Sequence, residues 1–141
     1  MLVTLDVLES KGACKNGIEY FKSLEKQEWE VIELMKRCFK DGKCYFAEWL
    51  FQCVETVEEL GKAIDLTIKN EGYLGGVFSN CKELFEKNQE LFKKAVEYHI
   101  EKGECLHYAF EYCNDCNKAF ENDPELHKKA LEHQKKYCHK A

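Results

Sequence analysis

Residues 43–70, KCYFAEWLFQCVETVEELGKAIDLTIKN, carry the amphipathic pattern around which we expect the fold to be organised. Apolar residues recur there at steps of three and four, which places them on one face of an α-helix. The positions between them are mostly charged or polar and would face water. The pattern predicts one continuous helix roughly 40 Å long, at about 1.5 Å per residue. Its apolar face consists of Phe46, Leu50, Cys53, Val57, Leu60, Ile64 and Ile68.

Shorter amphipathic segments lie on both sides of this stretch and must pack along its apolar face. Asp41-Gly42 and Gly103 indicate helix ends, and Asp123-Pro124 is typical of a helix start. The sequence therefore predicts an all-α fold, a compact bundle of six to eight helices around the long one. The first shorter helices are expected over residues 4–10, with Thr4 as the cap, 13–24 and 27–40.

The length of 141 residues suits a single domain, and we expect one helical domain over residues 1–141. The pairs Glu71-Gly72 and Gly75-Gly76 mark a candidate hinge near 71–76, because glycines interrupt regular structure. The nine cysteines are an odd number in a chain long enough to have its own core. We interpret them as free thiols rather than as a disulfide framework.

The charge distribution argues against nucleic-acid binding. The net charge is −5, with 10 basic and 13 acidic residues in 1–70 and 11 and 13 in 71–141, so neither half is basic. No apolar run approaches the roughly 20 residues of a membrane-spanning helix. The first residues, MLVTLDVLESK, do not resemble a signal peptide. We expect a cytoplasmic protein that does not bind membranes.

One group of residues could bind a metal ion. Cys113-x-x-Cys116 is followed by His127 and His133, in the order of a zinc finger, but ten residues separate the halves instead of about twelve. On a helix the two cysteines would also fall on an apolar stripe, and free cysteine is often a buried core residue. The core interpretation leaves the protein without a cofactor. The alternative is a zinc-binding or thiol-redox protein that uses these four residues.

Signatures of catalysis are scarce. The chain has no GxSxG, HExxH, phosphate-binding glycine loop or calcium loop. Cys14 follows Gly12-Ala13 at a predicted helix start, where a thiol can become reactive. A catalytic cysteine also needs a base, and all five histidines lie in the last third of the chain. We favour a buried Cys14 beneath the long helix, and a protein that is not an enzyme.

Residues 8–54 contain a spaced set of mainly small, aromatic and cysteine residues. The residues of this set are Leu8, Gly12-Ala13-Cys14, Gly17, Phe21, Trp29, Cys38, Gly42 and Phe46-Ala47-Glu48-Trp49-Leu50. The set resembles a segment of small uncharacterised helical proteins of phages, prophages and bacterial mobile regions. Phe46 stands where those proteins have a Trp, and more residues separate Cys38 from Phe46. The resemblance implies a helical module and an origin in a mobile element, and it implies no catalytic residues.

A helical bundle without catalytic signatures usually acts through its surface. We therefore predict a non-enzymatic protein-binding module. The resemblance, together with the small size and acidity, suggests a phage-encoded inhibitor of a host defence system, similar to an anti-CRISPR protein. Acidic and aromatic residues beside the apolar stripe are the expected contacts with the partner. The candidates are Asp41, Tyr45, Glu48, Glu55, Glu58 and Glu59.

Overall fold

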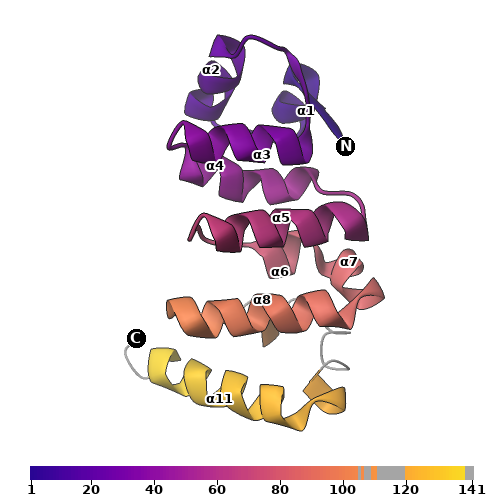
Figure 1. The fold of residues 1–141 in the computed structure, drawn as a ribbon, viewed down its shortest axis with the longest axis vertical. Helices are drawn as coiled ribbons and strands as arrows, with labels where there is room; N and C mark the ends of the chain where they lie inside the picture. Colours follow the sequence, from indigo (N-terminus) through magenta and orange to yellow (C-terminus); the bar gives the residue numbers. More distant parts are fainter. Residues whose placement is uncertain (105, 107–108, 111–119, 139–141) are drawn as a thin grey trace. The chain divides into compact units, whose positions relative to one another are not determined.

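The computed structural model of the chain describes residues 1–104, 106, 109–110 and 120–138 (Figure 1). This described part is mainly helical, which confirms the predicted helical class, and it includes one sheet of two short strands. It already contains more than eight helices, most of them shorter than predicted. The chain divides into two compact units, Met1–Tyr73 and Leu74–Ala141. The division falls within the 71–76 segment.

The first unit begins with an antiparallel pair of strands that the sequence analysis did not predict. Strand β1 (Leu2–Thr4) pairs with strand β2 (Glu28–Glu30), and the central residues of the two strands lie opposite each other. Trp29 is buried, whereas the glutamates on either side of it are exposed. Alternation of buried and exposed side chains at every second residue is typical of a β-strand, and Trp is among the residues enriched in strands. The helix predicted over residues 27–40 is therefore wrong at its start, and α3 (Val31–Lys40) begins after β2.

Several predicted helix ends are confirmed in the first unit. Helix α1 (Leu5–Ser10) starts at Thr4, whose hydroxyl oxygen accepts a hydrogen bond from a backbone N–H of the first turn. Helix α2 (Lys15–Ser23) follows after a short turn. After α3 the chain reverses at Gly42, whose φ of +73° is a left-handed conformation that glycine adopts without strain.

The continuous helix predicted over residues 43–70 is wrong, although most of its apolar face is buried. Thr56 has an extended backbone, and its hydroxyl accepts a hydrogen bond from the N–H of Glu59. The Glu59 carboxylate accepts one from the N–H of Thr56 in return. This capping box starts a new helix, because it provides partners for backbone N–H groups that lack one at a helix start. Residues 44–69 form three successive elements: α4 (Cys44–Trp49), the 3-10 turn η1 (Leu50–Cys53) and α5 (Val57–Lys69).

Helix α3 is the centre of the first unit. It packs against both α4 and α5, and the three helices lie side by side (Figure 1). The shorter α3 therefore takes the place of the predicted long central helix. The largest fully buried side chains of this unit are Phe21, Phe51, Leu8, Leu34, Met35, Leu50, Leu60 and Ile64.

Predicted boundaries are also confirmed in the second unit. Gly103 ends α8 in a left-handed conformation with φ of +76°. The Asp123 carboxylate accepts a hydrogen bond from the backbone N–H of Leu126 and so caps α11. Helices α8 and α11 lie side by side (Figure 1). The helices bounded in this unit are α6 (Val77–Asn80), α7 (Lys82–Lys87), α8 (Gln89–Lys102) and α11 (Pro124–Cys138).

Phenylalanine rings form much of the core of the second unit. Phe78 contacts Phe85 and Phe92 with centroid distances of 5.6 and 5.4 Å, and Phe120 lies 5.3 Å from Phe92. The His99 ring lies 4.8 Å from Phe78 and is 2% exposed. Ring pairs at these separations are favourable and contribute to stability beyond the area that they bury.

Candidate functional site

A pocket of about 540 Å³ opens in the first unit between α2, the turn after α3, and α4. Its size is in the range of sites that hold a small molecule or a large side chain of a partner protein, roughly 300–1,000 Å³. Most of its lining is apolar or aromatic. The lining residues are Ala13, Cys14, Asn16, Gly17, Tyr20, Gly42, Lys43, Cys44, Tyr45, Phe46 and Trp49.

A glycine of α2 faces an aromatic ring of α4 beside the pocket. Gly17 is buried in α2, and a Cβ atom at this position would lie 3.5 Å from two ring atoms of Phe46. Phe46 makes an edge contact with Tyr20 and a tilted contact with Trp49, each at a centroid distance of 5.9 Å. These rings form a continuous aromatic wall along the pocket.

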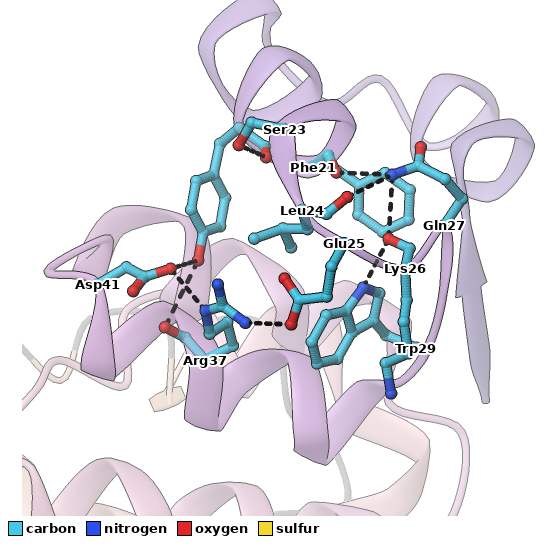
Figure 2. Close-up of polar contacts among 10 residues, drawn as sticks. Phe21, Ser23, Leu24, Glu25, Lys26, Gln27, Trp29, Arg37 and Asp41 are labelled. Atoms are coloured by element: carbon cyan, nitrogen blue, oxygen red, sulfur yellow. Dashed lines mark hydrogen bonds and ion pairs between the residues drawn. The ribbon is translucent and has the colours of Figure 1, made fainter.

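The Tyr20 side of the pocket is held by a polar network. The Tyr20 hydroxyl donates a hydrogen bond of 2.7 Å to Asp41, which also pairs with Nε of Arg37 at 2.9 Å. Figure 2 shows the Arg37 guanidinium between Asp41 and Glu25, with a distance of 2.6 Å to the Glu25 carboxylate. Burial and the hydrogen bond to Asp41 raise the pKa of Tyr20, while the Tyr20 and Arg37 contacts lower the pKa of Asp41. The phenol therefore stays protonated and donates to a carboxylate.

Side-chain hydrogen bonds stabilise the loop between α2 and β2. The Gln27 amide nitrogen donates to the carbonyl oxygens of Phe21, Leu24 and Lys26 at 3.3, 3.1 and 3.0 Å (Figure 2). The indole N–H of Trp29 donates to the Lys26 carbonyl at 3.0 Å. These bonds connect the loop to Phe21 in the last turn of α2 and to Trp29 in β2.

Two cysteines line the pocket and differ from the other cysteines whose side chains are described. Cys14, the N-cap of α2, and Cys44, the first residue of α4, are exposed. The interpretation of Cys14 as a buried residue is therefore wrong, since no long helix covers it. Cys38, Cys53 and Cys81 are buried, and the burial of Cys53 agrees with its place on the predicted apolar face of residues 43–70. Burial raises the pKa of Cys38 to about 12 and that of Cys53 to about 11.

Of the six predicted contact residues, Tyr45 alone lines the pocket. Its side chain is 88% exposed. Asp41 lies beside the pocket, and its carboxylate is already bonded to Tyr20 and Arg37. Glu48 is half-buried on α4, and burial raises its pKa.

The other three predicted contact residues lie at the start of α5. Glu58 pairs with Lys62 at 3.2 Å, and Glu55 is exposed. Glu59 caps the helix and also pairs with the N-terminal ammonium group of Met1. Glu58 and Glu59 line another, smaller hollow of about 460 Å³ between α3 and α5. The structure thus divides the six residues between two places.

Sequence reasoning missed most of the pocket. Gly17, Tyr20 and Lys43 are not predicted as site residues by the sequence, because each has an ordinary helical neighbourhood. One signal was available in the dense aromatic run that includes Tyr45, Phe46 and Trp49, which all line the pocket.

The predicted metal ligands can be followed only in part. Cys113 and Cys116 lie outside the described residues. The His127 ring stacks on Phe120 at a centroid distance of 5.0 Å, and His133 Nε2 lies 2.6 Å from the Glu104 carbonyl oxygen. Among the residues that the structure describes, no group of three or more His, Cys, Asp and Glu side chains is placed to hold a metal ion.

Comparisons of the chain with protein-family models, with curated proteins and with solved structures find no match. Within the described ranges, no helix combines the length and the apolar character that crossing a membrane requires. Function is therefore inferred from the pocket and its surroundings.

Proposed function

We propose that the first unit is a non-enzymatic protein-binding module and that the aromatic pocket between α2 and α4 is its docking site. The observation that carries the proposal is Tyr45, a large side chain that is 88% exposed at a mostly apolar pocket. Tyrosine combines an apolar ring with a polar tip, and such side chains contribute much of the binding energy at protein interfaces. The pocket beside it would receive an anchoring side chain of the partner.

The charge of the lining indicates the chemistry of the partner. Among the described residues that line the pocket, Lys43 is the only charged one, and none carries a carboxylate. Its Nζ lies 5.5 Å from the centroid of the Tyr20 ring, and within the described part of the chain it forms no ion pair. A partner segment with a large apolar side chain next to an Asp or Glu would fill the pocket and pair with Lys43.

Selection from a displayed peptide library tests this proposal. Peptides that bind the wild-type chain are expected to share a large apolar residue beside an Asp or Glu. Tyr45→Ala should weaken their binding about tenfold or more, as truncation of an interface hot spot does, and Lys43→Glu should weaken it by charge reversal. Tyr73→Ala is the matched control, because Tyr73 is also exposed, at 54%, but does not line the pocket.

The same peptides provide a footprint of the site. A peptide in the pocket is expected to slow alkylation of Cys14 and Cys44 by iodoacetamide, since both cysteines line the pocket. The proposal is contradicted if no sequence is enriched, or if the selected peptides bind the Tyr45 and Lys43 variants as tightly as the wild type.

The more specific prediction, a phage-encoded inhibitor of a host defence system, is a protein-binding function of this kind. It is supported by the resemblance of residues 8–54. Affinity capture from a lysate that contains a CRISPR effector, with Tyr45→Ala as the matched bait, tests it. Recovery of the effector at near-stoichiometric yield with the wild type and its loss with the variant are expected. Equal recovery with both baits would place the contact elsewhere.

Zinc binding through Cys113, Cys116, His127 and His133 stays a prediction. Elemental analysis of the native protein tests it directly, because bound zinc would be present in a fixed ratio to the chain. Unfolding by a chelator would support a structural zinc site.

A further inference from the structure

The cysteines whose side chains are described fall into two groups by exposure. Cys38, Cys53 and Cys81 are buried, whereas Cys14 and Cys44 are exposed. The two exposed cysteines come from different helices, 30 positions apart, yet both line the α2–α4 pocket. The Cys14 sulfur lies 3.7 Å from the position of a Cβ atom on Gly17, the residue that faces Phe46. The pocket is therefore the place where this unit exposes thiols.

Exposure and charge decide which reagents reach these thiols. Thiol–disulfide exchange needs a thiolate that can approach a disulfide sulfur, so buried cysteines react slowly. Lys43 directly precedes Cys44 and is the only charged side chain in the lining, as far as the structure describes it. Its positive charge favours an anionic reagent over a cationic one, at the short range over which exposed charges act in salt. A small anionic disulfide, of the kind that glutathione forms, meets these conditions.

We propose that Cys14 and Cys44 are sites of reversible mixed-disulfide formation with an anionic disulfide such as glutathione disulfide, and that this modification closes the docking pocket. In each reaction the cysteine thiol loses its proton and its sulfur attacks one sulfur of glutathione disulfide. A new S–S bond to the protein forms as the old S–S bond breaks. The second glutathione leaves as a thiolate and takes up the released proton. The closing of the pocket rests on the proposed function, whereas the modification does not.

Incubation of the full-length native chain with glutathione disulfide, followed by peptide mapping, tests the modification. Glutathione is expected on Cys14 and Cys44, at rates at least tenfold above those of Cys38, Cys53 and Cys81, and a reductant should remove it. The proposal is overturned if the buried cysteines react as fast as the two pocket cysteines, or if neither pocket cysteine is modified.

The contribution of Lys43 is measured by comparing glutathione disulfide with cystamine, a cationic disulfide. Lys43→Glu should slow modification of Cys44 by glutathione disulfide by about threefold or more and speed up modification by cystamine. Lys69→Glu makes the same change in net charge at an exposed residue outside the pocket and should leave both rates unchanged. Equal effects of the two variants would show that net charge, and not the pocket, selects the reagent.

The effect on the pocket is measured with 8-anilinonaphthalene-1-sulfonate, a fluorescent aromatic anion that has the chemistry of the proposed ligand. The reduced wild type should bind this probe, and modification should weaken binding about tenfold or more. In the double variant Cys14→Ser, Cys44→Ser, the addition of glutathione disulfide should leave probe binding unchanged, whatever the affinity of the variant itself for the probe. Both substitutions are at exposed positions, and serine is a good N-cap.

The possible results separate the two proposals. Unchanged probe binding after full modification of both cysteines would overturn closure of the pocket and leave the docking site in place. A reduced wild type that binds neither the probe nor any selected peptide would contradict the docking site, while the peptide map would still decide the modification.

Discussion

The stability of the first unit is expected to depend on small changes at individual residues. Gly17 and Gly42 both lie beside the pocket, but for different reasons. Gly17 is helical and faces Phe46 across ordinary van der Waals distances, whereas Gly42 has a φ of +73° and open space, with no atom within 4 Å of where a Cβ would lie. The backbone conformation, and not the available space, therefore decides whether each of these glycines can be replaced by a residue with a Cβ atom.

Alanine at these two glycines is expected to have opposite effects. Gly17→Ala should raise the free energy of unfolding by about 0.5–1 kcal/mol, because alanine has the higher helix propensity and its Cβ meets Phe46 at 3.5 Å. Gly42→Ala should lower it by about 1 kcal/mol, because alanine is strained in the left-handed region. Urea unfolding of both variants followed by circular dichroism measures the difference. Destabilisation by both would show that α2 and α4 are packed more tightly than the distances indicate.

In the second unit, His99 is an ionisable residue in an aromatic core. Its Nδ1 lies 2.9 Å from the Ala95 carbonyl oxygen, and its Nε2 lies 3.7 Å from a Glu104 carboxylate oxygen. Burial lowers the pKa of His99 to about 4. The folded chain therefore holds His99 neutral at a pH where an unfolded chain would protonate it.

This difference predicts a pH dependence of stability. Neutral His99 contributes fully to the free energy of unfolding above pH 6.5, the ordinary pKa of histidine. This contribution is lost as the pH falls towards 4, because the unfolded chain then binds a proton that the folded chain does not. Between pH 6.5 and 5 the loss is about 1.5 kcal/mol. His99→Leu should remove this part of the pH dependence, which urea unfolding of both proteins at the two pH values measures. The same slope in wild type and variant would mean that His99 is not the group responsible.

At the scale of elements, the interruption within residues 43–70 changes the fold most. The apolar period runs on through the break, so periodicity alone predicts one helix. The signal for the break was nevertheless present, because Thr56-x-x-Glu59 is a capping-box pattern followed by apolar residues. The strand β2 was harder to predict, since Trp29 fits an apolar stripe on a helix as well as it fits a strand.

Removal of the cap tests its contribution to the start of α5. Thr56→Ala should lower the free energy of unfolding by about 1 kcal/mol, because it leaves the N–H of Glu59 without its partner. Ser10→Ala is the control, since the exposed Ser10 hydroxyl bonds only a carbonyl within its own helix, and its effect should stay within about 0.5 kcal/mol. Both values come from chemical denaturation. An equal effect of the two variants would show that α5 starts without help from the capping box.

At the scale of the whole molecule, the first unit has its own hydrophobic core and carries the complete pocket. A chain of 73 residues is within the usual range of domain sizes. The proposed docking site and the proposed modification sites therefore belong to the same compact unit.

A fragment of residues 1–73 is expected to fold by itself, with a helical spectrum and a cooperative urea transition. It contains four cysteines, of which Cys14 and Cys44 are exposed and Cys38 and Cys53 are buried. Titration with a chromogenic disulfide should therefore detect two fast thiols in the native fragment and all four after unfolding. Four fast thiols without denaturant would show that the core of this unit does not form alone.

The helical class and several boundaries, such as the Thr4 cap, the turn at Gly42 and the start of α11, could be predicted from the amino-acid sequence. These features depend on a few neighbouring residues, whose local hydrogen bonds and backbone preferences are the same in most folds. The pairing of β1 with β2, and the pocket that Cys14, Tyr20 and Tyr45 line together, became known from the three-dimensional fold. Such features arise from packing between residues that are distant along the chain. The local periodicity of a sequence does not predict which distant residues will pack together.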